Sequence, residues 1–257
     1  MTFTDSKQRF SSRVADYVRF RPGYPSELIA LLRTECGLRP GHIVADLGSG
    51  TGFLSELFLK NGNRVYGVEP NEAMRQAGEE YLASYDGFSS IDAAAESTTL
   101  DAASVDFVTA GQSFHWFQPE TAKAEFRRIL KANGWIVVAW NDRELDTPFA
   151  TAYEDLLVKF GTDYTKVRDA YPEKSAMDQF FSGGAVSMRS LPNEQVFDLE
   201  GLIGRVRSSS YAPQEGHANY EPMMAAILEL FRANEKEGHV RMEYSTHVYY
   251  GRLGKQE

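Results

Sequence analysis

A loop containing three glycines is the first feature of the sequence that could do chemistry. Gly48, Gly50 and Gly52 follow the β-rich segment 43–47, and apolar residues resume helical spacing over 54–58. Because glycine lacks a β-carbon, such a loop can turn sharply and let a ligand approach its backbone amides. A glycine triplet alone is equally typical of a tight structural turn. A second feature is therefore needed to indicate a ligand site.

Glu69 is that second feature. It ends the next β-like segment, 64–69, about 20 residues after Gly48, which is where an acidic residue meets ribose hydroxyls in mononucleotide-binding α/β folds. The loop and the acidic residue support each other. Together they favour an adenosine-containing ligand over a purely structural turn.

The spacing of the loop residues indicates which ligand this is. The dinucleotide fingerprint is G-x-G-x-x-G, whereas residues 48–52 read G-S-G-T-G, with Asp46 just before them. A loop that binds a pyrophosphate has no use for this acidic side chain. The segment 46–52 resembles the first motif of the class I S-adenosylmethionine (SAM) dependent methyltransferases, which is an acidic residue, one spacer and this glycine pattern.

The resemblance extends along most of the chain. Later motifs of the same family are similar, in the same order, to residues 65–70 with Met74, to Ala95 and Glu96, and to residues 104–108 and 130–135. The small-molecule branch that includes trans-aconitate methyltransferase resembles this chain more narrowly, at Tyr17 with residues 21–25 and at residues 114–117, 244–246 and 249–253.

The resemblance implies a role for each matching residue. The glycine loop would lie beside the methionyl part of SAM, Glu69 would bind the ribose, and Ala95 with Glu96 would hold the adenine. Ala94 departs from the family, because many relatives have an aspartate at that position. The predicted SAM-binding residues are Tyr17, Arg21, Asp46, Gly48, Ser49, Gly50, Gly52, Glu69, Pro70, Met74, Ala95, Glu96, Gln112, Ser113 and Phe114.

Residues 112–116 are predicted to face the transferred methyl group. They follow the fourth predicted strand, at the carboxyl edge where open α/β sheets bind ligands. Methyl transfer from a sulfonium is an in-line displacement, so alignment supplies most of the catalysis and a base is needed only for some acceptors. His115 is the candidate base, and a neutral imidazole packed beside Trp116 is the alternative. Tyr24, His115 and Trp116 are the predicted acceptor-binding residues.

Several arginines could bind an acidic ligand. Arg21 could pair with a carboxylate of SAM or of the acceptor, or it could only order the turn at 22–23. Four arginines of the predicted cap segment are further candidates, and one or two of them could bind an acidic acceptor, although a surface position is the simpler interpretation for each one. They are Arg143, Arg189, Arg205 and Arg207.

The elements that position these residues alternate between β-like and helical segments. Ser26 is predicted to cap a helix that stops at Gly37, and the alternation over 43–140 predicts an α/β fold with a doubly wound, mostly parallel, Rossmann-like sheet. Apolar residues at every second position over 240–250 predict a final antiparallel strand that returns to the sheet. The predicted divisions are an N-terminal lid and first helix (1–40), a SAM-binding core (41–140), a helical cap insertion that sets acceptor specificity (141–238), with a strand-like stretch at 186–191, and the C-terminal strand (239–257).

Composition restricts the partners. The net charge of −9 repels a phosphate backbone, so we expect no nucleic acid partner. Cys36 is the single cysteine, and the histidines lack metal-ligand spacing, so we expect no disulfide and no metal. The most apolar run, 135–140, is too short to span a membrane, and residues 1–20 lack a signal-peptide core. These observations predict a cytoplasmic protein, as a monomer or a homodimer.

The sequence therefore predicts a SAM-dependent methyltransferase that transfers a methyl group to a small molecule, with O-methylation of a carboxylic acid as the first candidate reaction. A nicotinamide-dependent oxidoreductase is an alternative that the glycine spacing and the final strand disfavour. A non-catalytic SAM-binding sensor, which would pass closure of its cap to a partner, is a further alternative.

Overall fold

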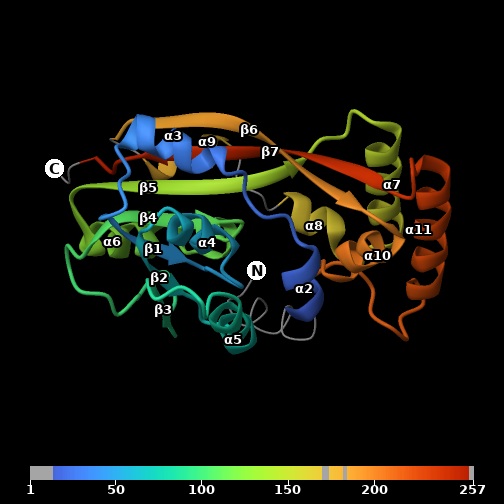
Figure 1. Cartoon of the computed structure of the whole chain (residues 1–257), viewed down its shortest axis with the longest axis horizontal. Coiled ribbons are helices and arrows are strands. Elements are labelled where there is room, and N and C mark those ends of the chain that lie inside the picture. The colour runs from blue at the N-terminus through green and yellow to red at the C-terminus, as the bar shows by residue number, and fades with distance from the viewer. Residues whose placement is uncertain (1–13, 170–173, 182–183, 255–257) are drawn as a thin grey trace.

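β-rich segments over residues 43–143 pair in parallel, and two later strands extend the same sheet. The computed structural model describes residues 14–169, 174–181 and 184–254, and its seven-stranded sheet has the order β3-β2-β1-β4-β5-β7-β6 (Figure 1). The strands are β1 (Ile43–Leu47), β2 (Arg64–Val68), β3 (Phe88–Ile91), β4 (Val105–Gly111), β5 (Leu130–Arg143), β6 (Val186–Phe197) and β7 (Val240–Gly251). The order reverses between β1 and β4, which makes the carboxyl ends of these strands a natural crevice for a ligand.

Helices connect and cover these strands. They are α2 (Val14–Phe20), α3 (Glu27–Cys36), α4 (Phe53–Lys60), α5 (Glu72–Tyr81), the short 3₁₀ helix η1 (Phe114–Trp116), α6 (Pro119–Ile129), α7 (Pro148–Phe160), α8 (Tyr164–Asp169), α9 (Lys174–Phe180), α10 (Leu199–Arg207) and α11 (Tyr220–Asn234). Helices α4, α5 and α6 each follow a strand of the parallel part of the sheet. The predicted doubly wound α/β fold is confirmed.

The ends of helix α3 show one correct and one wrong prediction. Gly37 ends the helix in the left-handed conformation, with φ of 67°, as its lack of a β-carbon allows. Ser26 precedes the helix, but its hydroxyl makes no capping bond to the backbone. It donates instead to the Glu27 carboxylate over 3.2 Å. The Ser26 hydroxyl, which was predicted to cap the helix, therefore donates its hydrogen bond to the charged carboxylate of the next residue.

The final strand is antiparallel, as predicted, and it lies between two neighbours. Strand β7 pairs with β5 from Arg143–Tyr244 to Ile136–Gly251 and with β6 along its whole length. Strand β5 starts before and ends after the predicted stretch 135–140. The segment predicted as a helical cap contains helices α7 to α11, and it also contributes β6 as an edge strand of the sheet.

Three clusters of buried side chains stabilise the sheet and the cap. Both faces of the sheet are apolar, with Val108 and Phe126 in one cluster and Phe58 and Val137 in another. A separate cap core packs α7, α10 and α11 against the first half of β7, through residues that include Tyr153, Leu202, Ile227 and Met242. Each fully buried side chain of this size contributes about 1.5–3 kcal/mol relative to its exposed state.

The N-terminal segment rests on the cap. Phe20, at the end of α2, is buried, and its ring lies so close to Gly204 that a β-carbon there would be 2.1 Å away. The Phe20 carbonyl accepts from Gln195 Nε2 over 3.1 Å. Residues 1–13 of the predicted lid lie outside the described residues.

Among the described helices, none combines the length and the hydrophobicity that crossing a bilayer requires.

Candidate functional site

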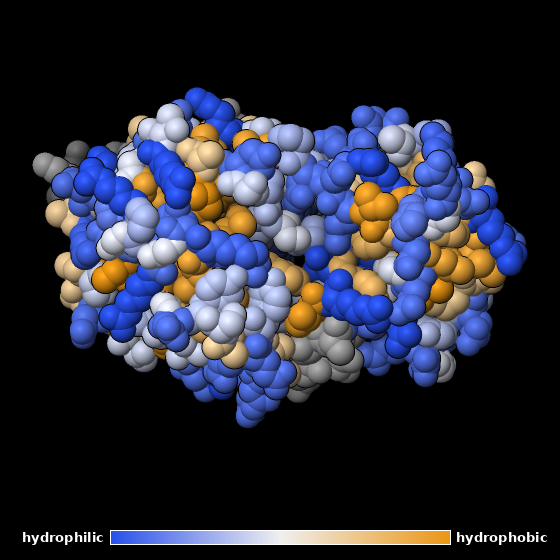
Figure 2. All heavy atoms as spheres, in the orientation of Figure 1, coloured by the Kyte–Doolittle hydropathy of each residue, from blue (hydrophilic) through white to orange (hydrophobic). Residues whose placement is uncertain are grey.

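A cavity lies at the carboxyl ends of β1, β2, β4 and β5, where the sheet faces the cap. Figure 2 shows a hollow between the two parts of the molecule on this face. Most of the predicted site residues line the cavity, namely Tyr17, Arg21, Tyr24, Asp46, Gly48, Ser49, Gly50, Glu69, Pro70, Met74, Ala95, Glu96, Gln112, Ser113, His115 and Trp116. The fold thus brings together residues from α2, the loops of the parallel sheet and η1.

The glycine loop approaches its neighbours too closely for other residue types. Gly48 has φ of +63°, and a β-carbon on it would lie 2.6 Å from Ser113 Cβ. Gly50 has φ of +56°, and a β-carbon there would lie 3.3 Å from Met74 Cε. Both the left-handed backbone and the close contacts therefore require glycine. The loop presents its backbone to the cavity between Ser113 and Met74.

Glu69 joins two loops at this cavity. Its Oε2 accepts from Gly50 N over 3.0 Å and its Oε1 from Asn71 N over 2.7 Å. Burial raises the pKa of this carboxyl above its usual range, and the two backbone bonds and Arg75 partly counteract the shift. A carboxylate has about four acceptor positions, so Glu69 retains capacity for ligand hydroxyls on its cavity side.

Asp46 ties the end of β1 to its neighbours. Its carboxylate accepts from Ser55 Oγ over 2.6 Å and from Thr109 Oγ1 over 2.9 Å. Burial raises the pKa of Asp46 to about 6, against the effect of these hydrogen bonds. The acidic residue of the first motif thus fixes α4 and β4 around the glycine loop while it also lines the cavity.

Two polar atoms at this end of the cavity have room for a ligand partner. Glu96 Oε1 accepts from Gln118 N over 2.7 Å, whereas Glu96 Oε2 is buried without a hydrogen-bond partner among the described residues. Thr51 Oγ1 is also buried, and it too has no hydrogen-bond partner within the described part of the chain. Buried polar atoms are nearly always paired, so a ligand that carries donors fits here. The exocyclic amine of adenine is such a donor, and adenine is the group that the family resemblance assigns to Ala95 and Glu96.

Gly52 and Phe114 do not line the cavity, contrary to the prediction. Gly52 precedes α4 and faces the core, where a β-carbon would lie 2.5 Å from Leu82 Cδ1. Phe114 is buried against Phe180, with ring centroids 4.7 Å apart. Both residues belong to predicted motifs whose other members line the cavity. Gly52 lets the loop pack closely on Leu82, and Phe114 packs in the core.

His115 is packed between two indole rings. Its ring centroid lies 4.5 Å from that of Trp116 and 5.2 Å from that of Trp140. Burial lowers the pKa of His115 to about 4. The imidazole is therefore neutral at pH 7 and is a weak base, which fits the packed alternative at least as well as the catalytic one.

Most of the residues on the cap side of the cavity were not predicted as site residues. The cap side also contributes Asn141, Asp142, Arg143, Tyr164, Arg205, Ser210, Tyr211 and Tyr244. Of the four candidate arginines of the cap segment, Arg143 and Arg205 line the cavity, and Arg189 and Arg207 are exposed on the surface. A signal for Arg205 was present in the sequence, because it shares the apolar face of α10 with Leu202 and Val206 at helical spacing.

Comparisons with known proteins agree with this geometry. Residues 45–138 match the family model described as a methyltransferase domain. The uncharacterized methyltransferase C25B8.09 of Schizosaccharomyces pombe is 32% identical over 157 residues, which cover 58% of this chain and 59% of the relative. The uncharacterized methyltransferase Rv3342 of Mycobacterium tuberculosis is 32% identical over 169 residues, 64% of each chain. The chain thus matches less than two thirds of the length of these relatives.

Solved structures show the same fold. A candidate type II methyltransferase from Anaeromyxobacter dehalogenans has a TM-score of 0.63 and 22% identity, over 92% of this chain and 100% of that one. A phosphoethanolamine N-methyltransferase from Haemonchus contortus, solved with S-adenosylhomocysteine, has a TM-score of 0.59 and 13% identity, over 98% of this chain and 59% of that one. The matched segment contains the end of β1, the glycine loop, Glu69 and Glu96. Residues 45–138 of this chain therefore match a methyltransferase domain, and the chain has the fold of these solved methyltransferases.

Proposed function

We propose that this protein is a SAM-dependent methyltransferase that methylates a small molecule, with a carboxylic acid as the acceptor class. The observation that carries the proposal is one cavity lined both by the glycine loop with Glu69 and Glu96 and by the arginines of the cap. When bound, SAM supplies an electrophilic methyl group. The narrower likeness to the branch of trans-aconitate methyltransferase supports the same acceptor class.

The residues of the cavity suit this reaction through alignment rather than proton transfer. Glu69, Glu96 and the glycine loop would orient the cofactor, while Tyr24 and Trp116 would confine the acceptor. A carboxylate is already ionised at pH 7, so its methylation needs no base. The cap covers the carboxyl edge of the sheet and would exclude water from the reacting atoms.

Calorimetric titration with SAM and, separately, with NADH tests the cofactor. We expect micromolar binding of SAM and no heat with NADH. Binding of NADH alone would overturn the proposal in favour of an oxidoreductase. With SAM binding established, incubation of labelled SAM with a panel of metabolite acids distinguishes an enzyme from a SAM sensor, because a sensor binds the cofactor and transfers no label.

Replacement of His115 by phenylalanine tests how this ring acts. Because burial lowers the pKa of His115 to about 4, we expect kcat to have the same pH dependence between pH 6 and 8 in the wild-type protein and in His115→Phe. We also expect kcat of His115→Phe to stay within about tenfold of wild type. Trp116→Phe serves as the packing control. A hundredfold loss of kcat in His115→Phe alone, with SAM affinity intact, would instead assign His115 as a base.

A further inference from the structure

Two buried arginines from different elements meet at the cap end of the cavity. Arg143 ends β5, and its side chain is 11% exposed. Arg205 lies on α10 and is 4% exposed. Both line the same cavity as the glycine loop. Arginine is rarely buried unless a counter-charge accompanies it, so the partners of each guanidinium decide what this cluster does.

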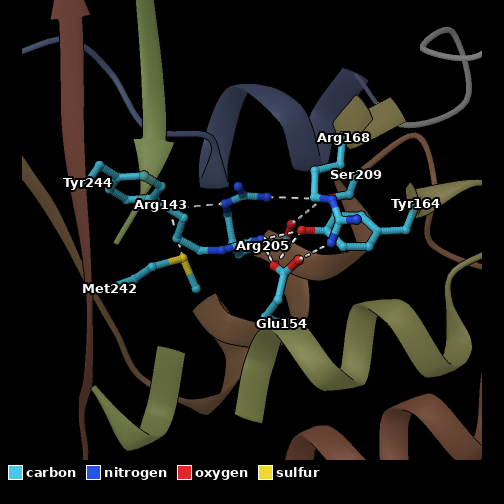
Figure 3. Close-up of polar contacts among 8 residues, drawn as sticks. All are labelled: Arg143, Glu154, Tyr164, Arg168, Arg205, Ser209, Met242 and Tyr244. Atoms are coloured by element: carbon cyan, nitrogen blue, oxygen red, sulfur yellow. Dashed lines mark hydrogen bonds and ion pairs between the residues drawn. The ribbon is translucent and has the colours of Figure 1, made fainter. Parts of the chain in front are cut away.

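Arg143 has an internal counter-charge. Its Nη2 lies 2.6 Å from Glu154 Oε2 and donates to Tyr164 Oη over 2.8 Å. Tyr164 Oη also donates to Glu154, and the more exposed Arg168 reaches the other carboxylate oxygen over 3.4 Å. Figure 3 shows Glu154 at the meeting point of these side chains. The single carboxylate therefore already serves two guanidinium groups and a phenol.

Arg205 has only neutral partners in the described residues. Its Nη1 donates to Ser209 Oγ over 3.0 Å and its Nε to Tyr244 Oη over 3.4 Å (Figure 3). No carboxylate of the described residues lies within ion-pair distance of Arg205. A buried charge without a counter-charge is costly. The cluster thus carries more positive than negative charge, and the cavity beside it has space for an anion.

Neighbouring groups show the same excess of positive charge. Although burial raises the pKa of the Tyr211 phenol, Arg205, Arg143 and Arg21 together lower it to about 8. Arg143 Nε is buried without a hydrogen-bond partner among the described residues. Hence a guanidinium donor and a positive potential both remain open to a ligand at this end of the cavity.

We infer that Arg205 is the residue that selects an acidic acceptor, by binding its anionic group, and that Glu154 positions Arg143 as a second donor to the same group. The identification of the anion as the methyl acceptor rests on the proposed function, whereas the anion site itself rests on the buried charges. A planar guanidinium matches a carboxylate with two parallel hydrogen bonds, so the site favours carboxylate over a neutral ester or amide.

Calorimetric titration with sodium malonate, at an ionic strength matched with sodium chloride, tests this site. The full chain is first titrated with S-adenosylhomocysteine and then, once saturated, with malonate. We expect the wild type to bind malonate and Arg205→Met to bind it at least about thirtyfold more weakly. Arg207→Gln, on the same helix but exposed and paired with Asp16, is the matched control and should bind malonate like wild type.

Further readouts separate a binding role from a structural one. We expect Arg205→Met to fold with a melting temperature no lower than wild type and to bind S-adenosylhomocysteine normally, because the substitution removes a buried charge that lacks a counter-charge. If Arg205→Met does not fold, Arg205→Lys, which keeps the charge without the planar fork, should still weaken malonate binding.

The outcomes that count against each proposal differ. A wild-type protein that ignores malonate, or equal malonate affinity in wild type and the Arg205 variants, overturns the anion site. Malonate binding without any binding of S-adenosylhomocysteine overturns the proposed function and leaves the anion site intact.

Discussion

Replacing Glu154 by alanine should lower the free energy of unfolding by about 3–5 kcal/mol, because the change leaves the buried Arg143 without its counter-charge. Arg143 and Arg205 would then face each other in a buried cluster in which the described residues offer no carboxylate to either. For a chain of this size we expect a fall of roughly 6–20 °C in melting temperature. Urea unfolding followed by circular dichroism at pH 7 measures the change.

Glu194→Ala is the matched control for this effect. Glu194 also pairs with an arginine, Arg241, but both side chains are more than half exposed. Such surface pairs contribute about 1 kcal/mol or less. Equal losses in Glu154→Ala and Glu194→Ala would show that the cluster does not depend on its buried carboxylate.

Replacing Glu69 by alanine should weaken SAM binding by roughly tenfold to 150-fold, which corresponds to about 1.5–3 kcal/mol. The substitution removes the predicted acceptor of the ribose hydroxyls and also the bond that holds Gly50 N. Calorimetry of the variant with SAM measures the effect. Glu72→Ala, an exposed change in the first turn of α5, controls for the loss of one negative charge nearby. Unchanged SAM affinity in Glu69→Ala would reject the assignment.

The part of the cavity that the glycine loop and Glu69 line could be predicted from the sequence because its determinants are local. A positive φ at Gly48 and Gly50, and an acidic residue at the end of the next strand, are set by short segments of a regular fold. Where this reasoning failed, the tertiary packing decided. Gly52 and Phe114 belong to the right motifs, but Leu82 and Phe180, from other elements, take up the space in front of them.

At the proposed acceptor end, Arg143 and Arg205 were among the candidate arginines, but the cluster that they form could not be predicted because its residues meet only in three dimensions. Arg143, Glu154, Arg205 and Tyr244 come from β5, α7, α10 and β7, which are far apart in the chain. The strand-like stretch predicted at 186–191 ends just before Pro192, and proline is unfavourable in most strands. The structure places Pro192 on an edge strand, where β7 alone pairs with it and the missing amide proton is tolerated.

The long strands β5 and β7 have a mechanical consequence. Strand β7 contributes Val248 and Tyr250 to the core of the sheet and Val240 and Met242 to the cap core, without a break between them. A continuous hydrogen-bonded ribbon offers no hinge, whereas domain closure requires a few residues that can change their backbone angles. The cap should therefore move with the sheet as one body. Entry and exit of ligands then depend on the segment around α2. This segment contacts the cap through Phe20 and through the ion pair between Arg19 and Glu200, and it contacts the sheet side through Tyr17, which stacks on Phe53.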